Sequence, residues 1–334
     1  MDEGTDVPPT DRLTEYVETG AHDAAVTALE QYTAADSDAR HEALQALHDL
    51  ATTQPTVFTS VLPELAPFLD DPKRSVRLTT AKVFVAVADA EPAAVGRVSE
   101  PLLGRLADDE EFYYVRARAA EALGYVARDE PRAVDLRAFL AELRVGLSFD
   151  EPEVVAKLAK ALECVALGRP QRLTHHTGEL ATHLDDDAEL VRYHLLTAIA
   201  VVGCERPSAL ADCQAALGAC LEDESPYVRG RAAEALGLVA RADELECEVP
   251  EARLASLADE ESSFAAERAR YALDARDEGS AEAVVGVGSI RGIREETEEV
   301  VADITRPGEA MCRECGRALP NHGPPVCPEC GRPS

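Results

Sequence analysis

The chain has 334 residues, and 46% of them are hydrophobic, so it can bury a continuous apolar core and form more than one domain. Its 63 Asp and Glu residues against 33 Lys and Arg residues leave a formal net charge of −30 at pH 7. This charge argues against a general nucleic-acid binder, which needs a basic stripe, and no apolar run reaches the 18 residues of a membrane span.

The basic residues are almost all arginine, since lysine occurs only as Lys73, Lys82, Lys157 and Lys160. An acid excess with so little lysine resembles the haloarchaeal type of composition, in which a carboxylate-rich surface stays hydrated in molar salt. The alternative is a surface that attracts a basic partner, an attraction that molar salt would screen. The acidic start, MDEGTDVPPTD, is not a signal peptide, and the cysteine pattern suits a reducing compartment, so we expect a cytoplasmic protein.

In chain order, residues 1–35 are predicted to form N-terminal capping helices and residues 36–276 a repeat region. The segment YVRARAAEALG, which begins at Tyr114, recurs as YVRGRAAEALG from Tyr227. Looser versions are spaced 37 to 39 residues apart, and the residues before their arginine positions are Ala39, Val76, Val115, Val154, Val191, Val228 and Ala265. Such regular spacing is typical of a repeat architecture.

Each repeat is predicted to contain two helices. Acidic residues precede the first helix, where they can cap free N–H groups and offset the helix dipole. In one unit Val76, Thr80, Val83 and Val87 fall on a single stripe of that helix. A short turn, often containing proline, then begins a second helix that ends in leucine. Neither helix can hide its apolar face alone, so the units should stack into a solenoid.

The repeated pattern Asp-x(3–5)-Val-Arg-x-x-Ala-x-x-Ala-Leu resembles the HEAT repeat family. The resemblance implies an all-α fold, a right-handed α-α superhelix, in which the turn aspartate and the first-helix arginine form a ladder between neighbouring units. The series is interrupted by Val155 and Ala266. The ladder arginines would be Arg40, Arg77, Arg116, Arg192 and Arg229.

The resemblance also implies that the second helices line the concave face. Basic side chains gather on three successive second helices of this acidic chain, and they form a candidate partner-binding patch: Arg97, Arg105, Arg137, Arg144, Arg172, His176 and His183. Bidentate arginine contacts would let the patch hold an acidic peptide. The alternative is that these side chains pair with Asp135, Glu142 and Glu179 of the same chain. The cysteines in this region are interpreted as small core residues: Cys164, Cys204, Cys213, Cys220 and Cys247.

Residues 277–309 are predicted to form an acidic linker with a short helix, on which Val300, Val301 and Ile304 mark an apolar face. Two interpretations remain open. The helix docks back on the solenoid or binds a partner, or the segment only tethers the C-terminal module.

Residues 310–334 contain two CxxCG motifs, with eleven residues between the two cysteine pairs. Two residues between a pair of thiolates let both sulfurs face one metal ion, and the following glycine permits the backbone turn. The arrangement resembles the zinc-ribbon family, with Cys312, Cys315, Cys327 and Cys330 in the ligand positions. Four thiolates close the coordination shell, so we expect structural Zn²⁺ that stabilises the small module rather than a catalytic metal.

The sequence offers no recognisable nucleophile–base pair, phosphate-binding loop or open metal site. We therefore expect a non-catalytic, macromolecule-binding scaffold that has a protein partner, zinc as its cofactor and no membrane association. One alternative is a transcription- or nucleic-acid-associated adaptor that contacts nucleic acid through the ribbon, where Arg313, Arg317 and Arg332 outnumber Glu314 and Glu329. Another is a HEAT-like lyase-type enzyme, for which no site residue can be identified.

Overall fold

The repeated motif folds as a long helix that recurs along the chain. The computed structural model describes residues 7–242, 250–260, 262–274 and 286–306, and over these ranges the secondary structure is helical, without a strand. Two helices, α1 (Thr10–Glu18) and α2 (His22–Thr33), precede the repeats. The long first helices of the successive units are α3 (Ser37–Thr53), α5 (Arg74–Ala90), α8 (Tyr113–Asp129), α10 (Pro152–Gly168), α12 (Glu189–Glu205), α14 (Pro226–Ala240) and α16 (Ser263–Leu273).

The second segment of each unit is shorter than the first and is often interrupted. These segments are η1 (Pro55–Phe58), α4 (Leu62–Leu65) and η2 (Ala66–Asp70); α6 (Pro92–Val95), η3 (Gly96–Val98) and α7 (Ser99–Ala107); α9 (Leu136–Gly146); η4 (Pro170–Arg172) and α11 (Thr177–Ala181); η5 (Pro207–Cys213) and α13 (Gln214–Cys220); and α15 (Glu251–Ala258). The predicted second helix is thus a single helix in two of these units, as α9 and α15, and is divided into shorter pieces in the others. Between Pro55 and Asp70 the reason is local, because Pro63 and Pro67 each remove a backbone donor.

Neighbouring long helices pack against one another through small residues. Each of the helices from α3 to α16 contacts the next one along the stack. At Gly124 of α8, a Cβ atom would lie 3.0 Å from the Cα of Ala161 in α10, so a glycine allows this close approach. The buried apolar residues form one continuous cluster that runs from Leu13 in α1 to Val300 in the last helix, α17 (Ile290–Thr305). The core is thus shared between neighbours along a stack, as a solenoid requires.

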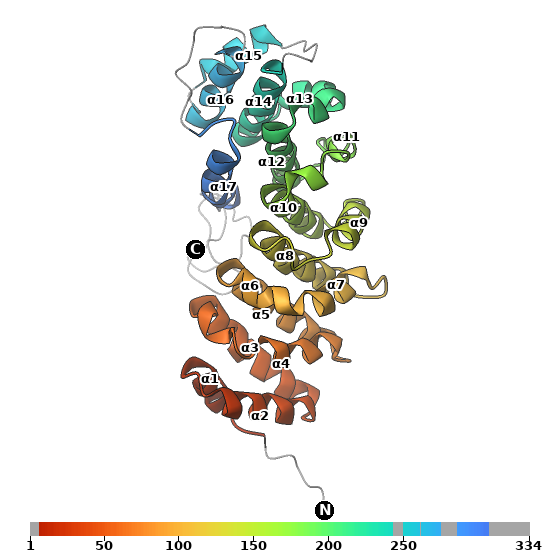
Figure 1. The fold of residues 1–334 in the computed structure, drawn as a ribbon, viewed down its shortest axis with the longest axis vertical. Helices are drawn as coiled ribbons and strands as arrows, with labels where there is room; N and C mark the ends of the chain where they lie inside the picture. The colour runs from red at the N-terminus through yellow and green to blue at the C-terminus, as the bar shows by residue number, and fades with distance from the viewer. Residues whose placement is uncertain (1–6, 243–249, 261, 275–285, 307–334) are drawn as a thin grey trace, which may run out of the picture.

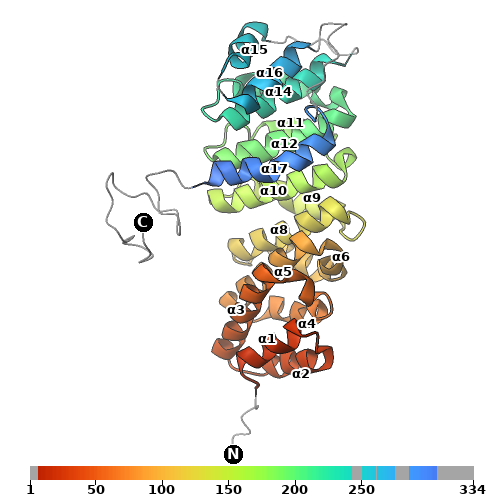
Figure 2. The same ribbon diagram turned by 90° about the vertical axis from the view of Figure 1, so that its left-hand side faces the viewer.

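The stack is bowed, and the long helices lie on the inside of the bend. Figure 1 shows α17 in the hollow beside the long helices, while α7, α9, α11 and α13 follow the opposite, outer edge. Figure 2, which looks onto the hollow, shows α17 in front of α10 and α12. The expectation that the second helices line the concave face is wrong. Small residues such as Gly124 let neighbouring long helices approach closely, as the inner side of a bend requires.

We call the side of the long helices that faces α17 the inner face.

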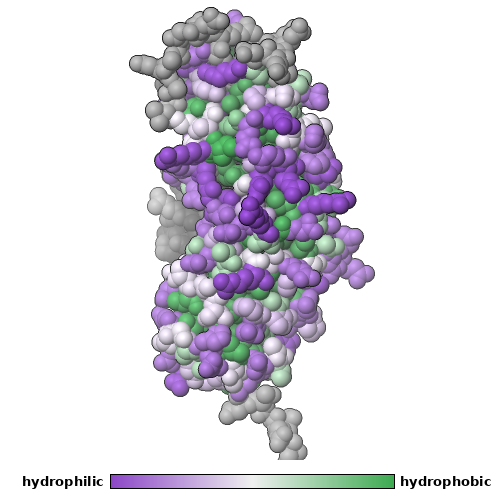
Figure 3. All heavy atoms as spheres, in the orientation of Figure 1, coloured by the Kyte–Doolittle hydropathy of each residue, from purple (hydrophilic) through white to green (hydrophobic). Residues whose placement is uncertain are grey.

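Figure 3 shows hydrophilic side chains over most of the visible side of the stack, with only small, separate hydrophobic areas. None of the helices that the structure describes is both long and apolar enough to cross a membrane.

Candidate binding surfaces

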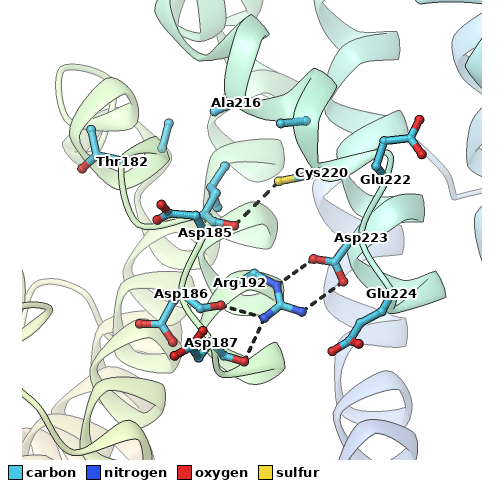
Figure 4. Close-up of a pocket in the computed structure, with 13 residues that line it drawn as sticks. Thr182, Asp185, Asp186, Asp187, Arg192, Ala216, Cys220, Glu222, Asp223 and Glu224 are labelled. Carbon is cyan, nitrogen blue, oxygen red and sulfur yellow. Dashed lines mark hydrogen bonds and ion pairs between the residues drawn. The ribbon is translucent and has the colours of Figure 1, made fainter.

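The predicted arginine ladder is present in four units. Arg192 of α12 donates two hydrogen bonds, of 2.7 and 3.0 Å, to the carboxylate of Asp223 in the next turn, and it also donates to the carbonyl oxygens of Asp186 and Asp187 in its own turn (Figure 4). The same double role is played by Arg40 with Asp71, by Arg77 with Glu111 and by Arg229 with Glu260. Each rung joins two units through a charged side chain.

Only some of the turn acids act as the expected helix caps. Asp36 caps α3, where its side chain accepts from the N–H groups of Asp38 and Ala39. Asp71 and Asp223 instead accept from a backbone N–H within their own turn, at 2.7 and 2.8 Å, and also pair with the ladder. The turn geometry thereby presents each carboxylate to the arginine of the preceding unit.

Arg116 does not form a rung of this kind. Its Nε donates to the carbonyl oxygen of Leu106 at 2.8 Å, and its guanidinium lies over the ring of Phe149, 5.1 Å from the centroid. The interruption at Val155 is seen, because this side chain is buried in the core. The sequence pattern therefore identifies the arginine position, but the carboxylates of Asp109 and Glu142 lie 3.7 Å from this guanidinium, too far for the hydrogen bonds of a rung.

The carboxylates of the turns before α12 and α14 line a pocket of about 680 Å³ around Arg192. The lining acids include Asp185, Asp187, Glu222 and Glu224. Since the one arginine that lines this pocket is engaged in the ladder, the pocket is best explained as the solvent-filled space beside a structural rung.

The predicted patch on the second helices does not form one surface of free cations. Arg105 pairs with Asp70 at 3.3 Å, and Arg144 with Glu179 at 2.6 Å; the latter is one of the intramolecular pairs foreseen as the alternative. His176 lies 3.6 Å from the same Glu179 carboxylate. Arg97 is exposed and His183 is half-buried. The patch also lies along the outer side of the bend rather than in the hollow (Figure 1).

Two members of the patch come together with residues that the sequence did not single out. Arg137 and Arg172 line a pocket of about 300 Å³ with Arg132 and Arg169. Asp135, proposed as an ion-pair partner, instead caps α9 by accepting from the N–H groups of Arg137 and Ala138.

The inner face carries the most distinctive arrangement, because α17 is docked on it. Ile293, Thr297 and Val300 form a stripe along α17 that is buried against the solenoid. Tyr227 of α14 donates to Asp303 of α17 at 2.9 Å, and Arg294 of α17 pairs with Asp129 of α8. Of the two interpretations of residues 277–309, docking therefore holds for residues 290–305.

A buried group of charges ties α17 to the end of the solenoid. Arg231 of α14 is fully buried and contacts Glu234 at 2.5 Å and Glu296 of α17 at 2.9 Å. Arg268 of α16 donates to Glu234 at 3.2 Å and to Glu296 as well. Burial opposes the charge of Arg231, but Tyr193, Glu234 and Glu296 outweigh it and raise the pKa of this arginine. Two arginines and two glutamates balance one another, which is what a buried ionic group needs.

Beyond α17, the inner face carries an unusual gathering of cations. Arg118 of α8 and Lys157 of α10 contact Glu121 at 2.8 and 3.2 Å, and Lys160 lies 3.5 Å from the same carboxylate. We call Lys82, Arg118, Lys157 and Lys160 the inner basic patch. Lys82 on α5 has no ion pair with any residue that the structure describes. Three of the four lysines of the chain are thus on this face.

Between the inner face and α17 lies a cavity of about 690 Å³. Its lining brings together Glu163, Cys164 and His194, and His194 Nδ1 lies 2.8 Å from the Glu163 carboxylate. This trio resembles a catalytic arrangement in composition, but burial raises the pKa of the Cys164 thiol to about 12. A thiol that stays protonated at neutral pH is a poor nucleophile, so Cys164 is a structural residue of the core.

The other predicted features fall partly outside the described ranges. Cys213 and Cys220 are buried and Cys204 is half-buried, as expected for core positions, while Cys247 lies outside the described residues. The four predicted zinc ligands, Cys312, Cys315, Cys327 and Cys330, also lie outside them. Within the described ranges, no group of three or more His, Cys, Asp or Glu side chains is placed to hold a metal ion.

Comparison with solved structures identifies the fold. A designed armadillo repeat protein is 22% identical, covers 64% of this chain and 99% of its own, and superimposes with a TM-score of 0.56. One engineered protein is 20% identical, covers 80% of this chain and 73% of its own, and gives a TM-score of 0.62. A second engineered protein is 21% identical, covers 65% of this chain and 99% of its own, and gives a TM-score of 0.57. No protein-family model and no curated protein matches the sequence. The chain therefore has the fold of armadillo-like helical repeat solenoids.

Proposed function

We propose that this protein is a non-catalytic scaffold that binds a protein partner on the inner face of its solenoid. The observation that carries the proposal is α17, an acidic amphipathic helix held on that face by a buried apolar stripe and by Arg231 and Arg268. A surface that holds one such helix has the curvature, the apolar floor and the cations to hold a further segment of the same kind.

Charge supports the choice of face. A chain with a net charge of −30 repels acidic partners over most of its surface. The inner basic patch is a local exception beside α17, and complementary charge sets the orientation of a docked segment. The similar solved structures support the fold on which such a surface is built; the armadillo protein among them is a designed one.

The finer features that the sequence predicts belong to the same proposal. We propose that the solenoid is of the HEAT type and right-handed, spans residues 36–276, and follows the capping helices of residues 1–35. We also propose that residues 310–334 form a ribbon in which Cys312, Cys315, Cys327 and Cys330 hold one structural Zn²⁺. The acid-rich, lysine-poor composition supports a halophilic, cytoplasmic protein.

A photo-crosslinking experiment tests the choice of face. A photoreactive amino acid replaces Ala86, which shares one side of α5 with Lys82, and in the control it replaces Val145, which is 61% exposed on α9 at the outer side. We expect the same protein to be captured repeatedly at position 86, not at 145, and to be lost when Lys82→Glu is added. Equal capture at both positions, or capture of nucleic acid at position 86, would contradict the proposal.

A further inference from the structure

One arrangement of three charged residues occurs twice on the inner face. The α14–α16 site consists of Arg231, Glu234 and Arg268, and the α8–α10 site consists of Arg118, Glu121 and Lys157. In both sites the arginine follows the Val-Arg pair of the repeat motif by two residues, and the glutamate follows that arginine by three. The second cation comes from the next long helix, three residues after the position aligned with that valine. The two sites are therefore equivalent positions of the repeat.

The contacts within the two sites match closely. In the α14–α16 site, Glu234 is 2.5 Å from Arg231 and 3.2 Å from Arg268. In the α8–α10 site, Glu121 is 2.8 Å from Arg118 and 3.2 Å from Lys157. Each glutamate is thus clamped between a cation of its own helix and a cation of the next. Each site, counted without any covering residue, contains two cations and one carboxylate and so carries a net charge of +1.

The sites differ in what covers them. Glu296 of α17 contacts both arginines of the α14–α16 site and neutralises its excess charge. No residue that the structure describes supplies an equivalent carboxylate to the α8–α10 site. The side chains of the α8–α10 site are correspondingly more exposed to solvent. The exposed fraction is 29% for Arg118 and 22% for Lys157, but 0% for Arg231 of the α14–α16 site.

Lys160 makes the α8–α10 site still more positive. It lies 3.5 Å from Glu121, so three cations surround one carboxylate. Burial raises the pKa of Glu121, but Lys157, Lys160 and Arg118 outweigh burial and leave that pKa below its ordinary value. Glu121 is therefore ionised at neutral pH, and the excess of two positive charges persists. Arg118, Glu121 and Lys157 do not line the cavity under α17, and the side chains of Arg118 and Lys157 remain partly exposed.

We propose that the α8–α10 site binds a glutamate or aspartate carboxylate on an acidic amphipathic helix of a partner protein, as the α14–α16 site binds Glu296 of α17. This inference rests on the proposed scaffold function and names its partner class. The argument is charge complementarity together with the internal equivalence of the two sites. The half-buried ring of Tyr125, one helical turn beyond Glu121 on α8, lines the adjoining cavity and can receive the apolar stripe of such a helix.

The test uses a synthetic peptide with the sequence of residues 290–305, labelled with a fluorophore and carrying a photoreactive group in place of Val301. Fluorescence anisotropy measures its binding to the full chain, and mass spectrometry maps its crosslinks. We expect saturable binding and crosslinks on α8 or α10. A peptide with Glu296→Gln should bind about tenfold more weakly or worse, because a carboxylate is lost between cations. This change leaves the folding of the chain untouched.

Variants of the chain provide the second arm. Arg118→Gln with Lys157→Gln should weaken peptide binding by a similar factor, whereas Arg97→Gln, which changes an exposed arginine outside the long helices, should not. Crosslinks on α14 or α16 would show that the peptide only exchanges with the resident helix, and would overturn the proposal. So would the absence of saturable binding, or equal binding by the Glu296→Gln peptide. If the peptide does not bind but a protein is still captured at position 86, the scaffold function stands and this inference alone fails.

Discussion

The Glu296 carboxylate of α17 contacts the guanidinium of Arg231, a fully buried residue of α14, at 2.9 Å. This contact joins a helix beyond the repeats to the inner face of the solenoid. It also explains how two fully buried arginines, Arg231 and Arg268, are tolerated, because Glu234 and Glu296 together balance their charge.

Glu296→Ala should release α17 while the solenoid stays folded. The change leaves Arg231 and Arg268 with one carboxylate instead of two, and the docked state should lose about 2–4 kcal/mol, since Glu296 itself is only partly buried. Hydrogen exchange of residues 290–305 is the measurement, and exchange in α8 and α10 reports on the repeats. Glu299→Ala, at an exposed position of the same helix, is the control. Unchanged protection of α17 in Glu296→Ala would show that the apolar stripe alone holds it.

Arg192→Ala should destabilise the solenoid by about 2–3 kcal/mol, since it removes two hydrogen bonds to Asp223 and leaves that carboxylate nearly buried without its partner. Urea unfolding followed by circular dichroism is the measurement. Arg206→Ala, which changes an exposed arginine just after α12, should alter the midpoint little. Equal effects of the two substitutions would mean that the ladder adds nothing to stability.

Gly168→Ala should destabilise the chain because the end of α10 lies against the backbone of α8. A Cβ atom at position 168 would lie 2.1 Å from the carbonyl oxygen of Ala127, and a backbone atom cannot move aside as a flexible side chain does. We expect a loss of about 2–3 kcal/mol in thermal or urea unfolding. Gly104→Ala in α7 is the matched control: nothing lies within 4 Å of its Cβ, so better helix propensity should stabilise by roughly 0.5–1 kcal/mol.

Acid should lower the stability of the folded chain through the protonation of His48. Burial, and then the charge of Lys82, lower the pKa of His48 below its ordinary value of 6.5, with Arg118 acting in the same direction and Asp49 opposing. A histidine whose pKa is lowered by folding contributes stability above pH 6.5, and that contribution is lost as the pH falls toward the pKa of the folded state. The drop in Tm between pH 7.5 and 5.5 should therefore be smaller in His48→Gln than in the unchanged chain. An identical drop in both would assign the acid sensitivity to other groups.

Zinc content tests the C-terminal module directly. The two CxxCG motifs predict one Zn²⁺ per chain in elemental analysis, and Cys312→Ser with Cys327→Ser should remove it. Removal of the metal by a chelator should leave the helical circular dichroism of the repeats unchanged, because the four cysteines lie outside the repeats in the sequence. A metal content that survives the double substitution would rule out this ligand set.

The repeat architecture and most of the ladder are properties of the sequence alone. A solenoid buries its apolar faces between neighbours, so the same residue types must return at every repeat, and the return is visible as spacing. The ladder follows the same rule at Arg40, Arg77, Arg192 and Arg229. At Arg116 it does not, because the guanidinium lies over the ring of Phe149 and stays 3.7 Å from the carboxylates of Asp109 and Glu142.

The direction of the bend and the position of α17 were decided only by the tertiary structure. Curvature depends on how closely two rows of helices pack, which is a difference between many contacts rather than a motif. Glu296 is one of several glutamates in its segment, and helical periodicity places it beside Ile293 and Val300, but nothing in the local sequence indicates which residues it contacts. Its role arises because the stack brings α14 and α16 side by side and places Arg231 and Arg268 beneath α17, where a single carboxylate can reach both.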